Sequence, residues 1–194
     1  MTFSNQITQR ISIFNEILND KIDSIQQIAD LIVETIANGG KVLTAGNGGS
    51  AANAQHITGD IVGRYKLERR AYPSITLTVD PSLVTAIAND YGYEQLFARQ
   101  IDGLGNKGDL LIVTSSSAHS PNILEGVQKA KEKGLTTLGV LGNNGGILKN
   151  ELDYSLLFDF KDSDLVEEMT MAIFHMALID VEERLKRMDD ENEN

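Results

Sequence analysis

A histidine and an aspartate stand four residues apart in the segment GSAANAQHITGD. His56 and Asp60 share one face if this segment is helical, because residues i and i+4 are neighbours on a helix surface. Such a pair can bind a divalent metal ion or serve as an acid and a base. It can equally be a solvated polar pair in which the carboxylate only orients the imidazole. Arg64 continues the same face and is a candidate contact for an anionic substrate.

The last long helical pattern, DLVEEMTMAIFHMALIDVEE, contains His175. Glu168 lies seven residues before this histidine on the same face, whereas Glu167 lies eight residues before it, about 80° around the helix. A buried core histidine is the simpler interpretation, because apolar residues surround it: Met169, Ala172, Ile173, Leu178 and Ile179. Spacing alone leaves the role of His175 open.

A glycine-rich turn, Gly46-Asn47-Gly48-Gly49-Ser50, follows the apolar run KVLTA. Glycines let backbone N–H groups approach a ligand, and the following helix N-terminus attracts anions. With Ala51 the turn fits the dinucleotide pattern G-x-G-x-x-[G/A] weakly, since the nearest equivalent of the usual acidic residue is Asp80. A Walker phosphate loop is excluded because no Gly-Lys-Ser/Thr follows. A tight turn without a ligand is the alternative.

A serine-rich loop, TSSSAHSPN, follows the apolar run DLLIVT. Ser120 is a favourable N-cap and Pro121 a favourable first helical residue, so the hydroxyls of residues 115–117 would lie beside a helix N-terminus. Neutral donors at such an end suit a single phosphate group. A solvated linker is the alternative, and we predict that His119 lies at the loop surface rather than against a ligand.

Short apolar runs alternate with helical patterns along residues 41–187, which predicts a doubly wound α/β domain with a parallel sheet. Strands are expected at 41–45, 74–79, 109–114, 136–141 and 154–158. Helices are expected at 50–65, at 81–104 in two pieces, at 120–133 and at 164–187. Two further helical patterns in residues 3–38 carry apolar stripes with no strand before them, so they are candidates for a subunit interface.

The composition is that of a globular protein, with 194 residues, 41% of them hydrophobic, and a net charge of −11. This charge argues against nucleic-acid binding through a general basic face. No cysteine is present, which excludes a disulfide framework and thiol catalysis. Neither a signal peptide nor a membrane span is recognisable, so we expect a cytoplasmic protein. The acidic residues 188–194 are expected to fray.

Together the motifs resemble those of the phosphoheptose isomerase family, within the sugar isomerase (SIS) domain superfamily. The resemblance covers nearly the whole chain and is carried by GNGGSAANAQH, VGRY, Ala88-Asn89-Asp90, the serine loop ending in SPN, LGVLGNNGG and the final helix. It implies one SIS domain over 1–194, with a three-layer, flavodoxin-like fold and a five-stranded parallel sheet. It also implies a homotetramer built largely by helices in 1–39, with active sites between subunits.

The implied reaction is the isomerisation of sedoheptulose 7-phosphate to D-glycero-D-manno-heptose 7-phosphate through an enediol, which supplies heptose for lipopolysaccharide, capsule or other surface glycans. The resemblance implies a bound zinc ion with the ligands His56, Asp60, Glu167 and His175. Catalysis is assigned to Asp60, His175 and Glu167. The implied substrate contacts are Asn47, Gly48, Ser50, Arg64, Asn89, Asp90, Ser115, Ser116, Ser117, Ser120 and Asp164.

The chain departs from the family pattern at several of these positions. Asp60 stands where glutamate is usual, and Glu167 where glutamine is usual. Two imidazoles and two carboxylates still suit zinc or another divalent ion. Asp60 is one methylene shorter, and we expect the carboxylate of Glu167 to compensate. In the serine loop, Ser116 replaces threonine, and Ala118-His119 replaces Gly-Asn.

Three other functions remain open from the sequence. A non-catalytic SIS protein that binds the replication initiator DnaA would share the fold. An isomerase of another sugar phosphate is compatible with the serine loop, since that loop recognises phosphate and not chain length. A nicotinamide-dependent dehydrogenase rests only on the weak glycine pattern.

Overall fold

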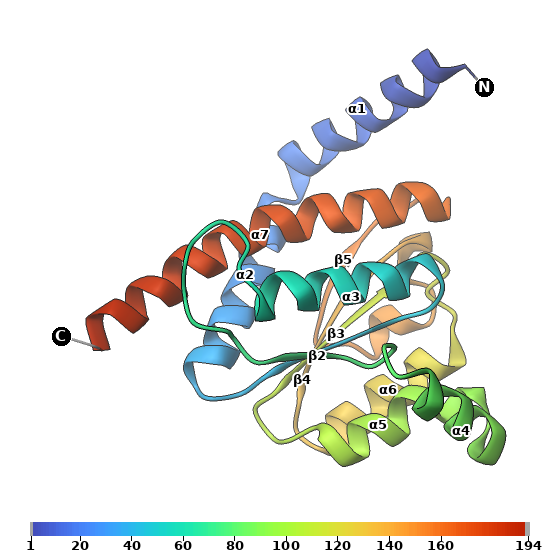
Figure 1. Cartoon of the computed structure of the whole chain (residues 1–194). Coiled ribbons are helices and arrows are strands. Elements are labelled where there is room, and N and C mark those ends of the chain that lie inside the picture. The colour runs from blue at the N-terminus through green and yellow to red at the C-terminus, as the bar shows by residue number, and fades with distance from the viewer. Residues whose placement is uncertain (1, 193–194) are drawn as a thin grey trace.

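Five parallel strands form a single sheet at the centre of the structure, a computed structural model that describes residues 2–192 (Figure 1). The strands are β1 Val42–Gly46, β2 Ser74–Thr76, β3 Leu110–Ser115, β4 Thr136–Leu141 and β5 Tyr154–Leu157, in the spatial order β2-β1-β3-β4-β5. This is the order of flavodoxin-like folds, whose ligand crevice lies at the switch point between β1 and β3. The predicted fold class is confirmed.

Helices cover both faces of the sheet. One face packs against α2 Ile22–Ala37, α3 Gly49–Val62 and α7 Ser163–Asn192, and the other against α5 Leu96–Leu104 and α6 Pro121–Glu132, with α4 Pro81–Tyr91 beside them (Figure 1). The first helix, α1 Phe3–Asp20, projects beyond this body. Short 3-10 turns occur at Tyr93–Gln95, Asn143–Gly145 and Leu148–Asn150.

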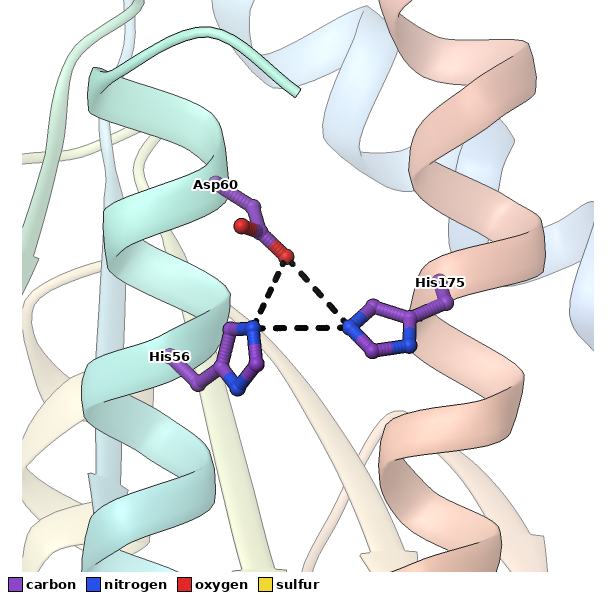
Figure 2. Close-up of side chains that lie close together, drawn as sticks. All are labelled: His56, Asp60 and His175. Carbon is purple, nitrogen blue, oxygen red and sulfur yellow. Dashed lines mark hydrogen bonds and ion pairs between the residues drawn. The ribbon is translucent and has the colours of Figure 1, made fainter. Parts of the chain in front are cut away.

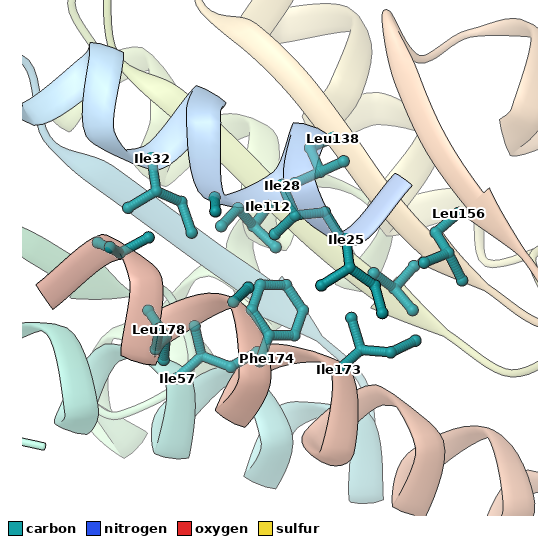
Figure 3. Packing of buried hydrophobic residues seen from close by; sticks show 14 of the residues in the cluster. Ile25, Ile28, Ile32, Ile57, Ile112, Leu138, Leu156, Ile173, Phe174 and Leu178 are labelled. Atoms are coloured by element: carbon teal, nitrogen blue, oxygen red, sulfur yellow. The ribbon is translucent and has the colours of Figure 1, made fainter. Parts of the chain in front are cut away.

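Alternate residues of the strands feed two separate cores, which is why the strand sequences read as continuous apolar runs. Ile112 of β3 joins the larger core, together with isoleucines of α2 and with Phe174 of α7 (Figure 3). Its neighbours Leu111 and Val113 join the smaller core on the opposite face. Helices α3 and α7 therefore lie in the same layer, where their polar surfaces can meet.

The second strand is three residues long instead of the expected six. It is an edge strand paired only with β1, and its register ends at Thr44 and Thr76. Beyond Leu77 the chain turns, because Asp80 caps α4 by accepting the backbone N–H groups of Ser82 and Leu83 at 2.9 and 3.1 Å. These hydrogen bonds lower the pKa of Asp80, with that from Leu83 contributing most. Asp80, the nearest match to the acidic residue of a dinucleotide-binding site, thus caps a helix.

The last helix continues to Asn192, so the predicted end near Arg187 is too early. Residues 188–192, which we expected to fray, are helical because Asp189 accepts hydrogen bonds from Arg70 Nε at 2.9 Å and Tyr72 Oη at 3.1 Å. Residues 193–194 of the predicted tail lie outside the described part of the chain.

The first helix exposes an apolar stripe. The exposed fractions of its apolar residues rise from 44% to 83% in the order Phe14, Ile11, Ile7, Leu18 and Phe3. Only Ile13 and Ile17 of this helix are buried. Among residues 2–192, no helix is both long enough and apolar enough to cross a membrane.

Candidate active site

The glycine turn and the serine loop lie side by side, because β1 and β3 are adjacent and in register at Gly46 and Thr114. Thr114 Oγ1 donates to the carbonyl oxygen of Ser50 at 3.0 Å. Gly46 is needed at this crossing, since a Cβ there would collide with that same carbonyl group. The two loops predicted from the sequence therefore lie next to each other at the switch point, where folds of this kind bind their ligands.

Two asparagine side chains bridge these loops. The amides of Asn47 and Asn122 exchange two hydrogen bonds of 2.9 Å, and Tyr93 Oη also donates to Asn47 Oδ1 at 2.9 Å. Asn122 is 2% exposed, and sequence reasoning missed it although it belongs to the SPN motif. The side chain of Asn47, predicted to contact substrate, is used here to join the loops.

The serine loop has a fixed shape at the start of α6. Ala118 adopts a φ of 54°, and its N–H donates to Ser115 Oγ at 3.0 Å. The N-cap residue Ser120 makes no capping hydrogen bond with its side chain. The hydroxyl of Ser120 therefore stays free of the cap interaction, at a helix N-terminus that favours anions.

The chain after β4 supports this loop from behind. Gly142 N–H donates to the carbonyl of Ser115 at 2.9 Å, and Ile147 N–H to that of Ala118 at 3.1 Å. His119 is exposed, as predicted, with Nδ1 2.7 Å from the carbonyl oxygen of Ser117.

Two histidines and one aspartate converge between α3 and α7 (Figure 2). Asp60 Oδ2 lies 3.6 Å from His56 Nε2 and 3.7 Å from His175 Nε2, and the two Nε2 atoms are 3.5 Å apart. The helical pair predicted at positions 56 and 60 is therefore present. His175 is not a core residue, because 36% of its side chain is exposed and its ring faces the pair.

This cluster fits a divalent metal ion. Asp60 Oδ2 is buried and has no hydrogen-bond partner within residues 2–192, which is costly for a carboxylate unless a cation faces it. Tetrahedral zinc places its ligand atoms about 3.3–3.4 Å apart, because each lies about 2.0–2.1 Å from the metal. The three observed separations are 3.5–3.7 Å. Three protein ligands also leave a coordination position open for substrate.

Glu167 does not join the cluster, contrary to the metal set expected from the sequence. Its carboxylate lies against Gly49 at the start of α3, where a Cβ would collide with it. Burial, with a smaller contribution from Asp164, raises the pKa of Glu167. The position is two helical turns before His56, so the expected compensation for the shorter Asp60 is not seen in this conformation.

Four predicted substrate residues have their side-chain partners outside the two loops and the cluster. Arg64 pairs with Glu68 at 3.2 Å, and Asn89 Nδ2 donates to Asp90 Oδ1 at 2.8 Å on the exposed side of α4. Asp164 lies 3.4 Å from Nη2 of Arg10 in α1. None of the four makes a hydrogen bond or ion pair with the loops or the cluster within residues 2–192.

The buried pair of Glu182 and Arg69 was also missed by sequence reasoning. Both side chains are 2% exposed, and Nε of Arg69 lies 2.9 Å from Glu182 Oε1. Burial alone would raise the pKa of Glu182, but three backbone N–H donors and Arg69 outweigh it and hold that pKa below its usual range. The available signal was a glutamate within the apolar pattern of the last helix, which needs a partner when buried.

The fold and its two adjacent loops define a member of the SIS domain class, and the model of the SIS domain family matches residues 3–142. The phosphoheptose isomerase of Burkholderia pseudomallei (strain 1710b) is 44% identical over 176 residues, which are 90% of this chain and 89% of that protein. The structure of a phosphoheptose isomerase from Francisella tularensis superposes with a TM-score of 0.87 at 34% identity, covering 93% of this chain and 98% of the other. The structure of the phosphoheptose isomerase from Neisseria gonorrhoeae superposes with a TM-score of 0.87 at 30% identity. The match covers 93% of this chain and 96% of the other.

The chain belongs to the phosphoheptose isomerase family. The expected resemblance and the expected enzyme class, a sugar-phosphate isomerase, are thereby confirmed.

Proposed function

We propose that the protein converts sedoheptulose 7-phosphate to D-glycero-D-manno-heptose 7-phosphate. The observation that carries this proposal is the triad His56–Asp60–His175, in a chain that is similar to phosphoheptose isomerases over most of its length. This reaction would supply the first heptose phosphate for nucleotide-activated heptoses used in surface glycans.

The phosphate group binds at the serine loop, where Ser115, Ser116, Ser117 and Ser120 offer hydroxyls at the N-terminus of α6. Ser50 lies on the neighbouring loop, and Asn47 and Gly48 shape that loop's approach to the sugar. Phosphate recognition alone does not measure the sugar chain, so isomerisation of a shorter sugar phosphate is the second candidate.

The chemical step is a proton transfer between two adjacent carbons. Asp60 removes a proton from C1 of the ketose, and the C1–H electron pair forms the C1=C2 bond of an enediol. His175 donates a proton to the C2 oxygen as the C2 carbonyl loses its double bond. The C1 hydroxyl then returns its proton to His175, and the O1–H electron pair forms the C1=O bond. C2 takes a proton from the acid form of Asp60, which yields the aldehyde at C1 and restores both side chains.

When bound, a divalent ion held by His56, Asp60 and His175 would supply positive charge beside the enediolate oxygens, in place of the proton that His175 donates without it. Glu167 is the alternative base, because burial raises its pKa and so makes its carboxylate a stronger base. Its placement against Gly49 makes Asp60 the stronger candidate in the conformation described here.

The direct test is incubation of the purified protein with sedoheptulose 7-phosphate, followed by NMR of the aldose. We expect turnover that a chelator lowers at least about a hundredfold and that added Zn²⁺ restores, because a catalytic metal stabilises the enediolate by several kcal/mol. Parallel reactions with five- and six-carbon ketose phosphates test the second candidate. Absence of turnover with every sugar phosphate, together with capture of DnaA, would instead support the non-catalytic function.

We further propose that the apolar stripe of α1 joins subunits into the homotetramer and places Arg64, Asn89, Asp90 and Asp164 at neighbouring sites. The support is that α1 exposes five large apolar residues, while these four side chains make no hydrogen bond or ion pair with the two loops or the cluster within residues 2–192.

Ile11→Glu is expected to dissociate the assembly, because burying an unpaired carboxylate in an apolar interface costs about several kcal/mol per ion. Ser12→Glu is the matched control, since Ser12 is exposed and lies about 100° around α1 from Ile11. Light scattering after size-exclusion chromatography measures the mass, and kcat should fall with dissociation. An Ile11→Glu variant of parental mass would contradict the proposed interface.

A further inference from the structure

The ring of Tyr65 stacks on the ring of His175. Their centroids are 5.5 Å apart, and the two planes differ by 15°. The same imidazole meets His56 edge to face, with a centroid distance of 5.1 Å and an angle of 68°. His175 is therefore held on one side by the tyrosine face, in the rotation that directs Nε2 toward Asp60 Oδ2.

Tyr65 lies in the irregular segment between α3 and β2, and Glu182 of α7 holds this segment. The backbone N–H groups of Tyr65, Lys66 and Leu67 donate to the Glu182 carboxylate at 2.9, 2.6 and 2.9 Å. Three consecutive peptide groups are thereby fixed to α7 by one buried anion. Glu182 stands seven residues after His175, two turns further along the same face of the helix.

The guanidinium of Arg69 completes this anchor and connects it to α3. Besides Nε to Glu182, its Nη2 donates to the backbone carbonyl of Asp60 at 2.9 Å, and its Nη1 to that of Gly63 at 2.8 Å. The last carbonyls of a helix lack partners within it, so Arg69 caps α3 at the residue that carries the cluster's carboxylate.

One buried ion pair thus reaches both sides of the cluster. Through Arg69 it fixes the backbone at Asp60, and through Tyr65 it fixes the ring of His175. Asp60 Oδ2 itself has no hydrogen-bond partner among the described residues. The placement of its backbone therefore matters more than it would for a carboxylate held by donors.

We propose that Tyr65, held by the Glu182–Arg69 pair, is a positioning residue that sets the orientation of His175 for proton transfer and metal binding. This inference rests on the proposed function of the cluster. The aromatic face does the positioning, and the hydroxyl is not required, since it makes no hydrogen bond within residues 2–192.

Tyr65→Leu and Tyr65→Phe form the matched pair, because leucine keeps apolar bulk without a ring and phenylalanine keeps the ring without the hydroxyl. In Tyr65→Leu, we expect kcat to fall about 10- to 100-fold and the Co²⁺ dissociation constant to rise about 10- to 100-fold, as for loss of other groups that orient metal ligands. KM for the sugar phosphate should change little, because the proposed phosphate site is the serine loop at the start of α6, which does not include Tyr65. Tyr65→Phe should retain parental values of all three.

Thermal melting separates positioning from a merely structural role. A structural role alone would lower the melting temperature of Tyr65→Leu while leaving its kcat and Co²⁺ affinity at 20 °C unchanged, and this result would overturn the proposal. Equal losses of kcat and Co²⁺ affinity in the Leu and Phe variants would overturn it as well, since the hydroxyl would then be the active part.

A parent protein without isomerase activity would refute the proposed function but not this inference, because Co²⁺ binding is measured independently. If the parent also fails to bind Co²⁺, the NMR signal of the His175 ring tests the stacking on Tyr65. The chain has three histidines, so ¹³Cε1-labelled histidine gives few resonances, and His175→Gln assigns its line. Loss of the tyrosine ring-current shift in Tyr65→Leu alone supports the stack, and an unchanged line in both variants contradicts it.

Discussion

Asp60→Asn and His175→Gln are each expected to lower kcat for sedoheptulose 7-phosphate by about 10²–10⁴-fold, the usual contribution of a general acid or base. Asparagine keeps the shape of the aspartate but removes the charge that faces both imidazoles at 3.6 and 3.7 Å. Glutamine at position 175 removes the imidazole from the triad. NMR of the aldose product gives kcat and KM, and titration with Co²⁺ gives the metal affinity.

The control is Asp23→Asn, which removes an exposed carboxylate from α2, far along the chain from the cluster. The double variant Asp60→Asn/His175→Gln should be little slower than the worse single variant, because residues that act as a unit are not additive. If both single variants isomerise the substrate at the parental rate, the catalytic assignment of Asp60 and His175 is wrong.

Glu182→Gln is expected to lower the free energy of unfolding by about 3–5 kcal/mol, as for other buried ion pairs that lose one partner. The change leaves Arg69 as a buried cation without its carboxylate. It also places an amide NH₂ group against N–H donors that, in the parent protein, face the carboxylate oxygens of Glu182. Urea denaturation at a fixed protein concentration measures the effect.

Glu183→Gln is the matched control for this experiment. Glu183 is exposed and adjacent in the same helix, so its replacement should change the free energy of unfolding by less than about 0.5 kcal/mol. An equally small effect at Glu182 would contradict the anchoring role of the pair.

The Glu182 variant also predicts a difference in acid stability. The folded-state pKa of Glu182 is lowered, so its contribution to stability is fully present above the unfolded-state pKa of about 4.3 and is lost as the pH falls through the folded-state value. The stability gap between parent and Glu182→Gln should therefore be constant from pH 6 to 8 and narrow below about pH 4.

The sequence was sufficient for features that depend on local patterns. Apolar runs bounded by glycine and serine turns predicted the strands, and the alternation with helices predicted a parallel sheet. The glycine and serine loops were correctly expected at the carboxyl ends of the strands, because that placement follows from parallel topology. The proximity of His56 and Asp60 follows from helical spacing alone.

Predictions from local patterns were wrong where a polar side chain outside the pattern determines the structure. The end of β2 is set by the cap at Asp80, and the extension of α7 by contacts of Asp189 with Arg70 and Tyr72. Glu167 was placed with the metal ligands by resemblance. Its side chain instead lies against Gly49, where the missing Cβ leaves room for the carboxylate.

The sequence by itself determined the fold class, the glycine and serine loops and one pair of the cluster, because each is encoded by periodicity or by neighbouring turn residues. Only the tertiary structure decided which polar groups of α7 face α3. His175 joins His56 and Asp60, while Glu182 lies two turns away and anchors the segment that carries Tyr65. These partners lie more than a hundred residues apart in the chain, and their meeting depends on how two helices pack on one sheet face, which no local spacing records.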